Sequence, residues 1–295
     1  MTRFIQANRG RFKVELICRT LGANPSTYYA ARSRPPSARA ISDAALTEEI
    51  QRVFEANYRV YGVRKIYHQL HREGIEVGRD RVWRLMGEAG LQGARRGKPK
   101  FTTRPDPSAP RPPDLVDRDF TAEAPNLLWV ADFTYVRTWQ GFAYVSFVED
   151  VFSRMIVGWS IATHMRTALV TEALEMAVWK RSCSVEGLVH HSDAGSQYTA
   201  VVYSEQMAAH GIVPSIGSVG DSYDNAMAES GIGLYKAELI WRQGPWRTVD
   251  QLEIATLEYV DWFNYRRLHG EIGHVPPAEF EEMHHGSRQE AEIKG

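Results

Sequence analysis

The sequence predicts an α/β protein in which a mixed five-stranded sheet flanked by helices follows a set of all-α segments. Three observations support this fold class. Apolar residues recur at helical spacing up to residue 89 and at strand spacing from residue 127 onward. Five prolines between residues 105 and 113 separate the two halves. The second half follows the order strand, strand, strand, helix, strand, helix, strand, helix, helix, which is typical of a layered α/β fold.

The composition is that of an ordinary globular chain. Its 295 residues are enough for about two domains, and 43% are hydrophobic and 24% charged. No apolar run approaches the roughly 20 residues of a membrane span, and the first ten residues have no signal-peptide core. We therefore expect a cytoplasmic protein with no membrane partner. The two cysteines are far apart, which argues against a disulfide framework or a cysteine zinc site.

Charge is divided unevenly along the chain. Residues 1–118 carry 23 Lys and Arg against 12 Asp and Glu, whereas the rest of the chain is acidic by a similar margin. A basic segment joined to an acidic one is typical of a polyanion-binding module attached to another domain. Two domains with different solvated surfaces would give the same pattern. Of the two, we favour a nucleic-acid partner.

Two groups of helices are predicted in the basic half. Residues 1–34 form a short helical hairpin, in which Gly22 ends one helix and Asn24-Pro25 begins the next. Residues 40–93 form three helices, over 43–56, 62–72 and 79–89, and Ser42 or Asp43 caps the first. The last two of these helices form a helix-turn-helix pattern.

The second helix of this pattern has a basic outer face that suits a DNA groove. Lys65 on the preceding helix is a further candidate for a DNA contact. A solvated helix face is the alternative, and Asp80 on the same helix favours it. The candidate DNA-binding residues of this segment are Lys65, Arg79, Arg81 and Arg84.

The remaining segments follow from breaker residues and periodicity. Residues 94–124 are a basic, Pro-rich extended linker that can follow phosphates. Residues 125–282 form the α/β domain, and residues 283–295 a polar, frayed tail. The strands of the α/β domain are expected at 127–137, 143–150, 155–162, 187–191 and 212–216. Its helices are expected at 167–181, 199–209, around Glu229 and at 249–268.

Three carboxylates occupy informative places in this topology. Asp132 interrupts the apolar first strand, where a buried carboxylate is costly without a partner. Asp193 follows the fourth strand, and parallel strands gather active groups at their carboxyl ends. Glu229 lies early in a helix that can pack across both strands. Converging carboxylates favour Mg²⁺ or Mn²⁺, and two such ions can catalyse phosphoryl transfer. Taken singly, each residue is more readily a cap or an internal hydrogen-bonding group.

The segment before Glu229 holds further candidates. Asp224 and Asn225 are good N-cap residues, and Lys236 lies two turns after Glu229 on the same helix face. Tyr223 and Asn225 are candidates for positioning DNA or for a structural role. Asp221 and Asp224 are rival ligands to Glu229. His190 and His191 are expected to be structural.

Several stretches resemble a known family. Residues 129–135, 190–198 and 220–230 look like the DDE signature of bacterial insertion-sequence transposases, members of the retroviral integrase superfamily with an RNase H-like core. The 35 residues between Asp193 and Glu229 and the lysine at position 236 match that signature. The N-terminal half resembles the family's second-frame product, the OrfB-type catalytic subunit. The resemblance covers nearly the whole chain.

The resemblance implies a site and a reaction. Asp132, Asp193 and Glu229 are then the catalytic residues and hold two Mg²⁺ ions when DNA is bound, with Mn²⁺ as a substitute. The activity implied is strand cleavage at insertion-sequence ends followed by strand transfer, and Lys236, Tyr223 and Asn225 contact DNA.

The resemblance also implies partners and a location. The DNA partners are the double-stranded terminal inverted repeats and the target, bound by a homo-oligomer. A protein encoded in the upstream frame, as a partner or as a fusion, completes the assembly at the bacterial nucleoid. The alternatives are a DNA-binding regulator or inhibitor of the full transposase and a simple RNase H-like nuclease. The three intact carboxylates argue against the first, and the helix-turn-helix segments against the second.

Overall fold

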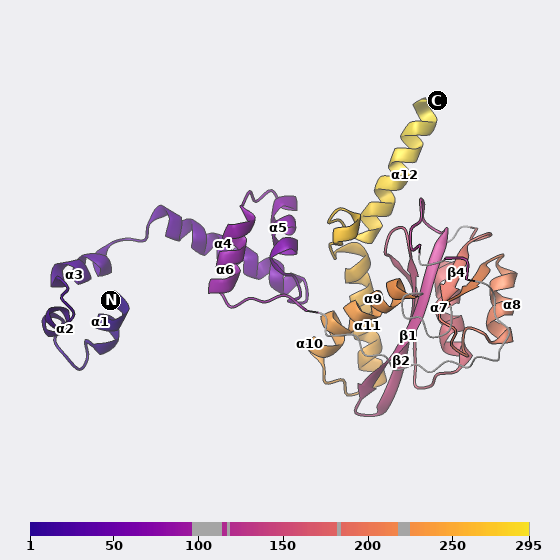
Figure 1. The fold of residues 1–295 in the computed structure, drawn as a ribbon, viewed down its shortest axis with the longest axis horizontal. Helices are drawn as coiled ribbons and strands as arrows, with labels where there is room; N and C mark the ends of the chain where they lie inside the picture. Colours follow the sequence, from indigo (N-terminus) through magenta and orange to yellow (C-terminus); the bar gives the residue numbers. More distant parts are fainter. Residues whose placement is uncertain (96–113, 117–118, 182–183, 218–224, 295) are drawn as a thin grey trace. The chain divides into compact units, whose positions relative to one another are not determined.

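The computed structural model describes residues 1–95, 114–116, 119–181, 184–217 and 225–294 (Figure 1). Contacts divide the chain into two compact units, Met1–Arg52 and Val53–Gly295, with the boundary inside helix α4 (Ala38–Ala56). Most of the linker expected at 94–124 lies outside the described residues, as do Tyr223, Asp221 and Asp224. The domain limits expected from the sequence remain predictions.

The first unit is a small helical cluster. It contains α1 (Thr2–Asn8), which the sequence did not predict, α2 (Val14–Thr20) and α3 (Pro25–Ser33). The side chain of Asn24 accepts a hydrogen bond from the Ser26 amide at 3.0 Å, so the predicted start of α3 is confirmed. The buried side chains that hold the cluster together are Ile5, Ile17, Cys18 and Tyr28.

Helix α4 begins earlier than expected. It starts at Ala38, so the prediction that Ser42 or Asp43 caps it was wrong. The side chain of Ser37 accepts a hydrogen bond from the Ala40 amide at 3.2 Å, and this bond serves one of the free donors of the first turn. Two prolines before Ser37 prevent the helix from extending further back.

The helix-turn-helix pattern of the second unit is present as α5 (Val63–Arg72) and α6 (Arg79–Glu88). The segment that carries it is attached to the C-terminal part of the same unit. The Trp262 indole donates a hydrogen bond to Asn57 Oδ1 at 3.0 Å. The Leu268 amide donates another to the Tyr61 hydroxyl at 2.8 Å. All four of these residues are buried, so the attachment is a packed interface.

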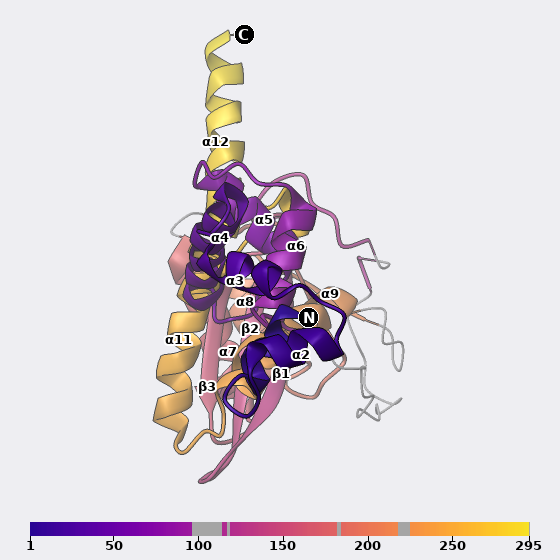
Figure 2. The same cartoon turned by 90° about the vertical axis from the view of Figure 1, so that its left-hand side faces the viewer.

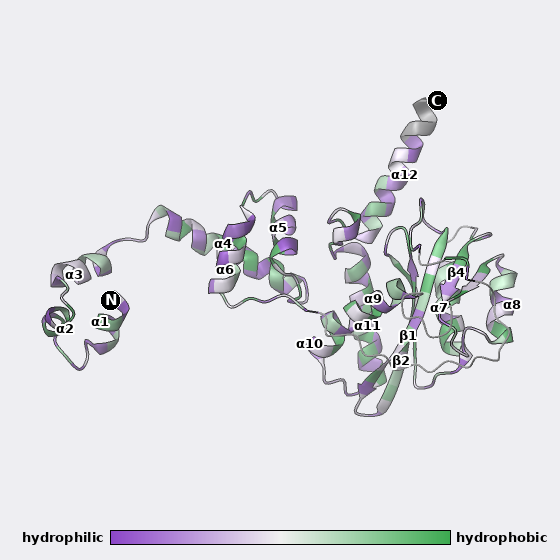
Figure 3. Ribbon diagram, in the orientation of Figure 1, coloured by the Kyte–Doolittle hydropathy of each residue, from purple (hydrophilic) through white to green (hydrophobic). Residues whose placement is uncertain are grey.

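The core of the second unit is the predicted mixed five-stranded sheet. Its strand order is β3-β2-β1-β4-β5, with β1, β2 and β3 antiparallel and with β4 and β5 parallel to β1. Apolar residues dominate the central strands (Figure 3). The strands span Leu128–Thr138 (β1), Gly141–Asp150 (β2), Ile156–Ala162 (β3), Val189–Ser192 (β4) and Val213–Ile216 (β5).

Helices cover both faces of this sheet. Helices α7 (Thr167–Arg181) and α8 (Val201–Ala209) lie on one side and α9 (Ala226–Tyr235) on the other (Figure 1). Trp129 and Leu174 belong to the core on the α7 side, while Val130 and Ala228 belong to the core under α9. Neighbouring residues of β1 therefore face different cores, as the period of a strand requires. Helix α11 (Val249–Tyr265) lies beside β3 (Figure 2).

The C-terminal segment departs most from expectation. A π-helical turn, η1 (Lys236–Ile240), and the short α10 (Trp241–Gln243) follow α9, and a 3-10 turn, η2 (Gly270–Ile272), follows α11, which ends before residue 268. The prediction of a frayed tail from residue 283 was wrong, because α12 (Pro277–Lys294) continues to Lys294. Its start is held by a bidentate pair between Glu281 and Arg181, with Nη1 to Oε2 at 2.6 Å. No helix among the described residues is long and apolar enough to cross a membrane.

Candidate active site

Asp132 and Asp193 lie at the same edge of two neighbouring parallel strands. Ala131 of β1 pairs with Ser192 of β4, and each is followed directly by one of the two aspartates. Asp132 Oδ1 accepts a hydrogen bond from the Phe133 amide at 2.7 Å, and Asp193 Oδ1 accepts one from Gly195 at 3.0 Å. Both side chains are half-buried. The second oxygen of each carboxylate is thus left for other partners at this edge.

The third carboxylate is positioned by the start of α9. The side chain of Asn225 donates a hydrogen bond from Nδ2 to the main-chain oxygen of Ala131 at 3.1 Å. Asn225 is the N-cap residue of α9, as the sequence predicted, but its side chain makes no cap hydrogen bond because its amide donates to β1 instead. Glu229 follows one helical turn later and is exposed. The hydrogen bond therefore brings the helix that carries Glu229 to the residue next to Asp132.

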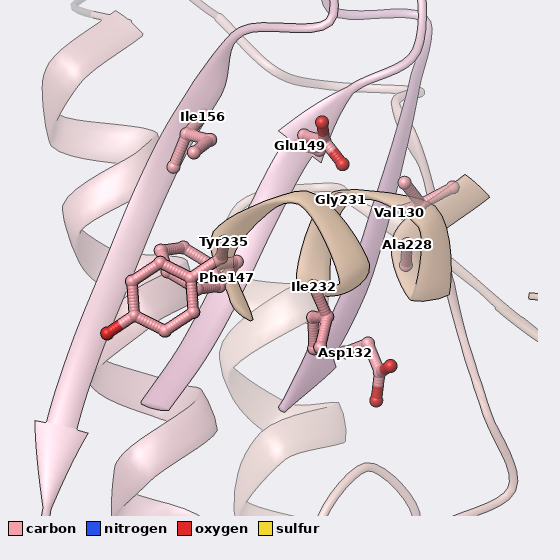
Figure 4. Close-up of a pocket in the computed structure, with 9 residues that line it drawn as sticks. All are labelled: Val130, Asp132, Phe147, Glu149, Ile156, Ala228, Gly231, Ile232 and Tyr235. Carbon is pink, nitrogen blue, oxygen red and sulfur yellow. The ribbon is translucent and has the colours of Figure 1, made fainter. Parts of the chain in front are cut away.

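A close contact sets the height of α9 above the sheet. Glu149 pairs with Val130 in the register of β1 and β2, so it lies on the same face of the sheet as Asp132. A Cβ atom added to Gly231 would overlap Glu149 Oε2. Figure 4 shows the helix lying over both strands with Gly231 near Glu149. Glycine at position 231 is therefore what lets the helix approach the sheet this closely.

The three carboxylates share one electrostatic environment. Burial raises the pKa of Asp132 well above its ordinary value, and the negative charges of Asp193 and Glu229 raise it further. Burial raises the pKa of Asp193 as well. Glu229 is exposed but partly shielded from water, which raises its pKa, and the charge of Asp193 raises it further. Asp132 therefore lies within electrostatic reach of the other two carboxylates, and a cation among them would relieve their repulsion.

This donor set fits a hard divalent cation. Carboxylate oxygens are the ligands that Mg²⁺ and Mn²⁺ prefer, and the two aspartates each have an oxygen with no hydrogen bond among the described residues. As the side chains lie, no three described His, Cys, Asp or Glu residues form a coordination group. Residues that would bind the ions are thus Asp132 and Asp193 from the sheet, with Glu229 from α9.

Lys236 borders the carboxylates from the end of α9. Its ammonium lies 5.6 Å from the centre of the Tyr135 ring, three residues along β1 from Asp132. Burial lowers the pKa of Lys236, and the charge of Asp132 acts in the opposite direction. The sequence placed Lys236 on the helix face of Glu229, but a π-helical turn begins at this residue. The lysine is therefore beside β1, within the electrostatic field of the site.

Comparison with known proteins identifies the family. Models of an integrase core domain match residues 122–222 and 210–277, and a model of an HTH-like domain matches residues 41–99. The catalytic core domain of HTLV-2 integrase, a solved structure, is 15% identical with a TM-score of 0.43, over 55% of this chain and 99% of that one.

Two curated relatives decide the question. The putative transposase for insertion sequence element IS986/IS6110 of Mycobacterium tuberculosis (strain ATCC 25177 / H37Ra) is 52% identical over 269 residues, which are 90% of this chain and 97% of the relative. The transposase for IS629 of Shigella sonnei is 51% identical over 284 residues, 95% of each chain. The chain belongs to the insertion-sequence transposases. The expected integrase core domain is confirmed with it.

His190, His191 and Asp150 are buried in the interior of the transposase and hydrogen-bonded there. His190 Nε2 hydrogen-bonds the Tyr203 hydroxyl at 3.0 Å, and His191 Nδ1 hydrogen-bonds Ser215 Oγ at 2.9 Å; both rings are buried. Asp150 accepts hydrogen bonds from the Asn126 amide at 2.7 Å and from the Trp129 indole at 3.2 Å. The structural role expected for His190 and His191 agrees with these contacts, and Asp150 likewise holds the start of β1 to the end of β2.

The candidate DNA-binding residues of the helix-turn-helix segment differ in their surroundings. Arg79 is exposed with its Nε 3.9 Å from Asp80, and Arg84 pairs with Glu88 at 3.0 Å. Arg81 is half-buried. Lys65 lies over the Tyr61 ring at 5.2 Å, near the interface with the C-terminal segment. Their contacts with DNA remain predictions, and Arg79 is the most accessible of the four.

The sequence did not predict a buried ion pair between Arg267 and Glu238. Arg267 donates from Nε and Nη2 to Glu238 at 2.8 and 2.7 Å, and both side chains are buried. Glu238 belongs to η1, two residues after Lys236, and Tyr259 donates to it from α11 at 3.2 Å. The pair joins the end of the helix that carries Glu229 to the C-terminal segment. The two residues are 29 positions apart, and local sequence patterns do not predict such a long-range pair.

Proposed function

We propose that this transposase cleaves a DNA strand at the ends of its insertion sequence and joins the end to target DNA, in reactions that depend on divalent cations. The observation that supports the proposal is the position of Asp132 and Asp193 side by side after paired residues of β1 and β4, with α9, which carries Glu229, held against β1 by Asn225. Each of the other two charges acts on Asp132. Cations held there would activate the attacking oxygen and stabilise the leaving oxygen of a phosphodiester.

The residues have distinct roles in this proposal. Asp132 and Asp193 bind from the rigid sheet, where main-chain amides fix one oxygen of each carboxylate. Glu229 binds from α9, whose position depends on Asn225 and Gly231. Lys236 neutralises a phosphate of the DNA end. The site therefore needs correct packing of α9 as well as the three carboxylates themselves.

The proposed reaction needs no covalent intermediate with the protein. In the first step, a water oxygen attacks the scissile phosphorus and the bond to the 3′-oxygen breaks, which leaves a 3′-hydroxyl and a 5′-phosphate. In the second step, that 3′-hydroxyl attacks a phosphodiester of the target, whose own 3′-oxygen leaves and takes up a proton. The first step consumes one water and one phosphodiester bond, and the water proton passes to the departing 3′-oxygen. The second step is a transesterification, so it conserves the number of phosphodiester bonds.

The experiment that tests this function uses element-end DNA and the full chain. Glu229→Gln keeps the size of the side chain and removes its charge, so we expect loss of Mg²⁺-dependent nicking and strand transfer with DNA binding retained. Glu253→Gln, at an exposed position of α11, is the matched control and should leave both activities intact. Nicking by Glu229→Gln at the wild-type rate would refute the assignment.

The same assay separates the enzyme from a regulator. The chain is assayed alone and together with the product of the upstream frame. Nicking in either case supports the enzyme, and the comparison shows whether the upstream product is required. DNA binding without nicking in both cases would favour the regulator.

A further inference from the structure

Part of β1 lies beyond the end of β4, and on the side away from β2 it pairs with no described strand until an isolated bridge joins Thr138 to Trp246. Strand β4 ends at Ser192, opposite Ala131, and no described strand pairs with residues 132–137 of β1 on that side. Figure 1 shows both long strands extending beyond the short β4. An extended polymer can therefore lie along this edge directly beside Asp132.

The open part of the hairpin carries exposed aromatic side chains. Tyr135 and Phe142 are 53% and 51% exposed, and their rings meet edge to face with centroids 5.5 Å apart. Trp139, at the turn, is 68% exposed. Single exposed aromatic residues are common on protein surfaces, but three on one hairpin form a patch of the kind that marks a binding site.

Cations alternate with these rings. The Lys236 ammonium lies over Tyr135, and the Arg247 guanidinium lies over Trp139 at 5.4 Å from the ring centre. Arg137 is exposed on β1 between the two aromatic residues. This concentration of positive charge stands out because the chain after residue 118 is acidic overall. The six residues, called here the hairpin strip, are Tyr135, Arg137, Trp139, Phe142, Lys236 and Arg247.

We propose that the hairpin strip binds unpaired nucleotides of the DNA strand whose phosphodiester lies at the active site. Aromatic rings stack on bases of any sequence, and interleaved cations neutralise the phosphates, which is the pattern of single-strand binding surfaces. Tyr135 is about 10 Å along β1 from Asp132 and Trp139 about 23 Å, so the strip leads away from the carboxylates. Tyr135 and Arg137 lie on the face of β1 opposite to Asp132, and Lys236, which borders the carboxylates, reaches the Tyr135 ring. Its positive charge favours a polyanion over a second copy of this chain. The proposal rests on the proposed function for the identity of the strand.

Binding to DNA without metal tests the strip. The full chain, in buffer with EDTA, is titrated into a fluorescent oligo-dT strand roughly 12 nucleotides long and into a blunt duplex of equal length. Tyr135→Ala and Phe142→Ala should each weaken binding to the single strand about tenfold and leave the duplex affinity nearly unchanged. Tyr135→Phe keeps the ring and should keep the affinity.

The matched control is Trp179→Ala on α7, where the indole is 82% exposed. This tryptophan is close in sequence to Arg181, which pairs with Asp150 at the end of β2 away from the turn. We expect unchanged binding to both probes, and unchanged melting temperatures in all the variants. Arg137→Gln and Arg247→Gln should each lower the salt dependence of single-strand binding by about 0.7 in log–log slope.

Three outcomes would overturn the proposal. They are unchanged single-strand affinity in Tyr135→Ala and Phe142→Ala, equal losses for single strand and duplex, and a loss of self-association in these variants, which would make the strip an interface between copies. Because the assay contains no metal, failure of the cleavage chemistry would not alter these affinities. The hairpin strip and the proposed function can therefore fail separately.

Discussion

Asn225 donates a side-chain hydrogen bond to the main-chain oxygen of Ala131, and this single bond joins the helix of Glu229 to the strand of Asp132. Asn225 is 6% exposed, so the bond is protected from water. An amide is suited to this position because it has N–H donors for a carbonyl acceptor. The bond links two of the three carboxylates through rigid elements.

Replacement of Asn225 by Asp should therefore impair the site. The carboxylate has no donor for the Ala131 oxygen, and the fold should lose about 1–3 kcal/mol for the unmet acceptor and the buried charge. We also expect the Mg²⁺ concentration for half-maximal nicking to rise roughly tenfold, as for groups that orient metal ligands. Denaturation and Mg²⁺ titration measure the two effects. Lower stability with unchanged Mg²⁺ dependence would limit Asn225 to a structural role.

Gly231→Ala should displace α9 from the sheet. The new methyl group would meet Glu149 Oε2, so we expect the Mg²⁺ concentration for half-maximal nicking to rise roughly tenfold. Gly233→Ala is the matched control, because an added Cβ there has no neighbour within 4 Å. It should stabilise the helix by up to about 1 kcal/mol and leave activity intact.

A second substitution tests the cause of the Gly231 effect. Glu149→Ala removes the side chain that the new methyl group meets. The double variant should therefore reach half-maximal nicking at a lower Mg²⁺ concentration than Gly231→Ala does. Activity in the double variant no better than in Gly231→Ala would show that another contact is responsible.

The buried pair of Glu238 and Arg267 should be needed for stability. Arg267→Leu leaves the Glu238 charge without its bidentate partner, and we expect a loss of roughly 3–5 kcal/mol in urea denaturation. Glu238→Met combined with Arg267→Leu removes both charges and should restore most of that loss. If the double variant is as unstable as the single one, packing of the guanidinium against Phe263 is the larger contribution.

Acid should destabilise the fold through His190. Burial lowers its pKa to about 4, below the ordinary value of 6.5, so the unfolded chain takes up the proton first. The stability that the neutral ring contributes is complete above pH 6.5 and is lost as the pH falls toward 4, by at most roughly 3 kcal/mol. Unfolding free energies of wild type and His190→Gln between pH 4.5 and 7.5 measure this. Parallel curves would contradict it. Burial lowers the pKa of His269 in the same direction, so the variant should remove only part of the slope.

The sheet and two of its carboxylates were accessible from the sequence for a physical reason. Strand and helix periods follow from burial, and the order of elements places Asp132 and Asp193 on neighbouring strands. The order of elements also placed Glu229 on a helix able to pack across both strands, and the family resemblance added the 35-residue spacing from Asp193. What the sequence did not provide was the placement of α9, because the bond from Asn225 and the contact of Gly231 with Glu149 join residues far apart in the chain.

The ends of the chain were harder to predict. Residues 283–294 are polar, which is typical of a frayed terminus, yet α12 continues through them from a start anchored by Glu281. Anchoring supplies the costly first turn, after which ordinary helix propensity extends the helix. Helix α1 is only seven residues long and depends on the packing of Ile5. Neither determinant can be read from local sequence.

The open edge of β1 has a consequence for the protein apart from DNA. Between Phe133, whose amide donates to Asp132, and the bridge at Thr138, β1 pairs with no described strand on the side away from β2. Such an edge is a template on which a strand of another molecule can add, the usual first step of aggregation. The exposed guanidinium of Arg137 on this strand acts as a gatekeeper against such addition. Removing that charge for a binding study should therefore also lower the solubility of the purified transposase, and a neutral replacement is best handled at low concentration.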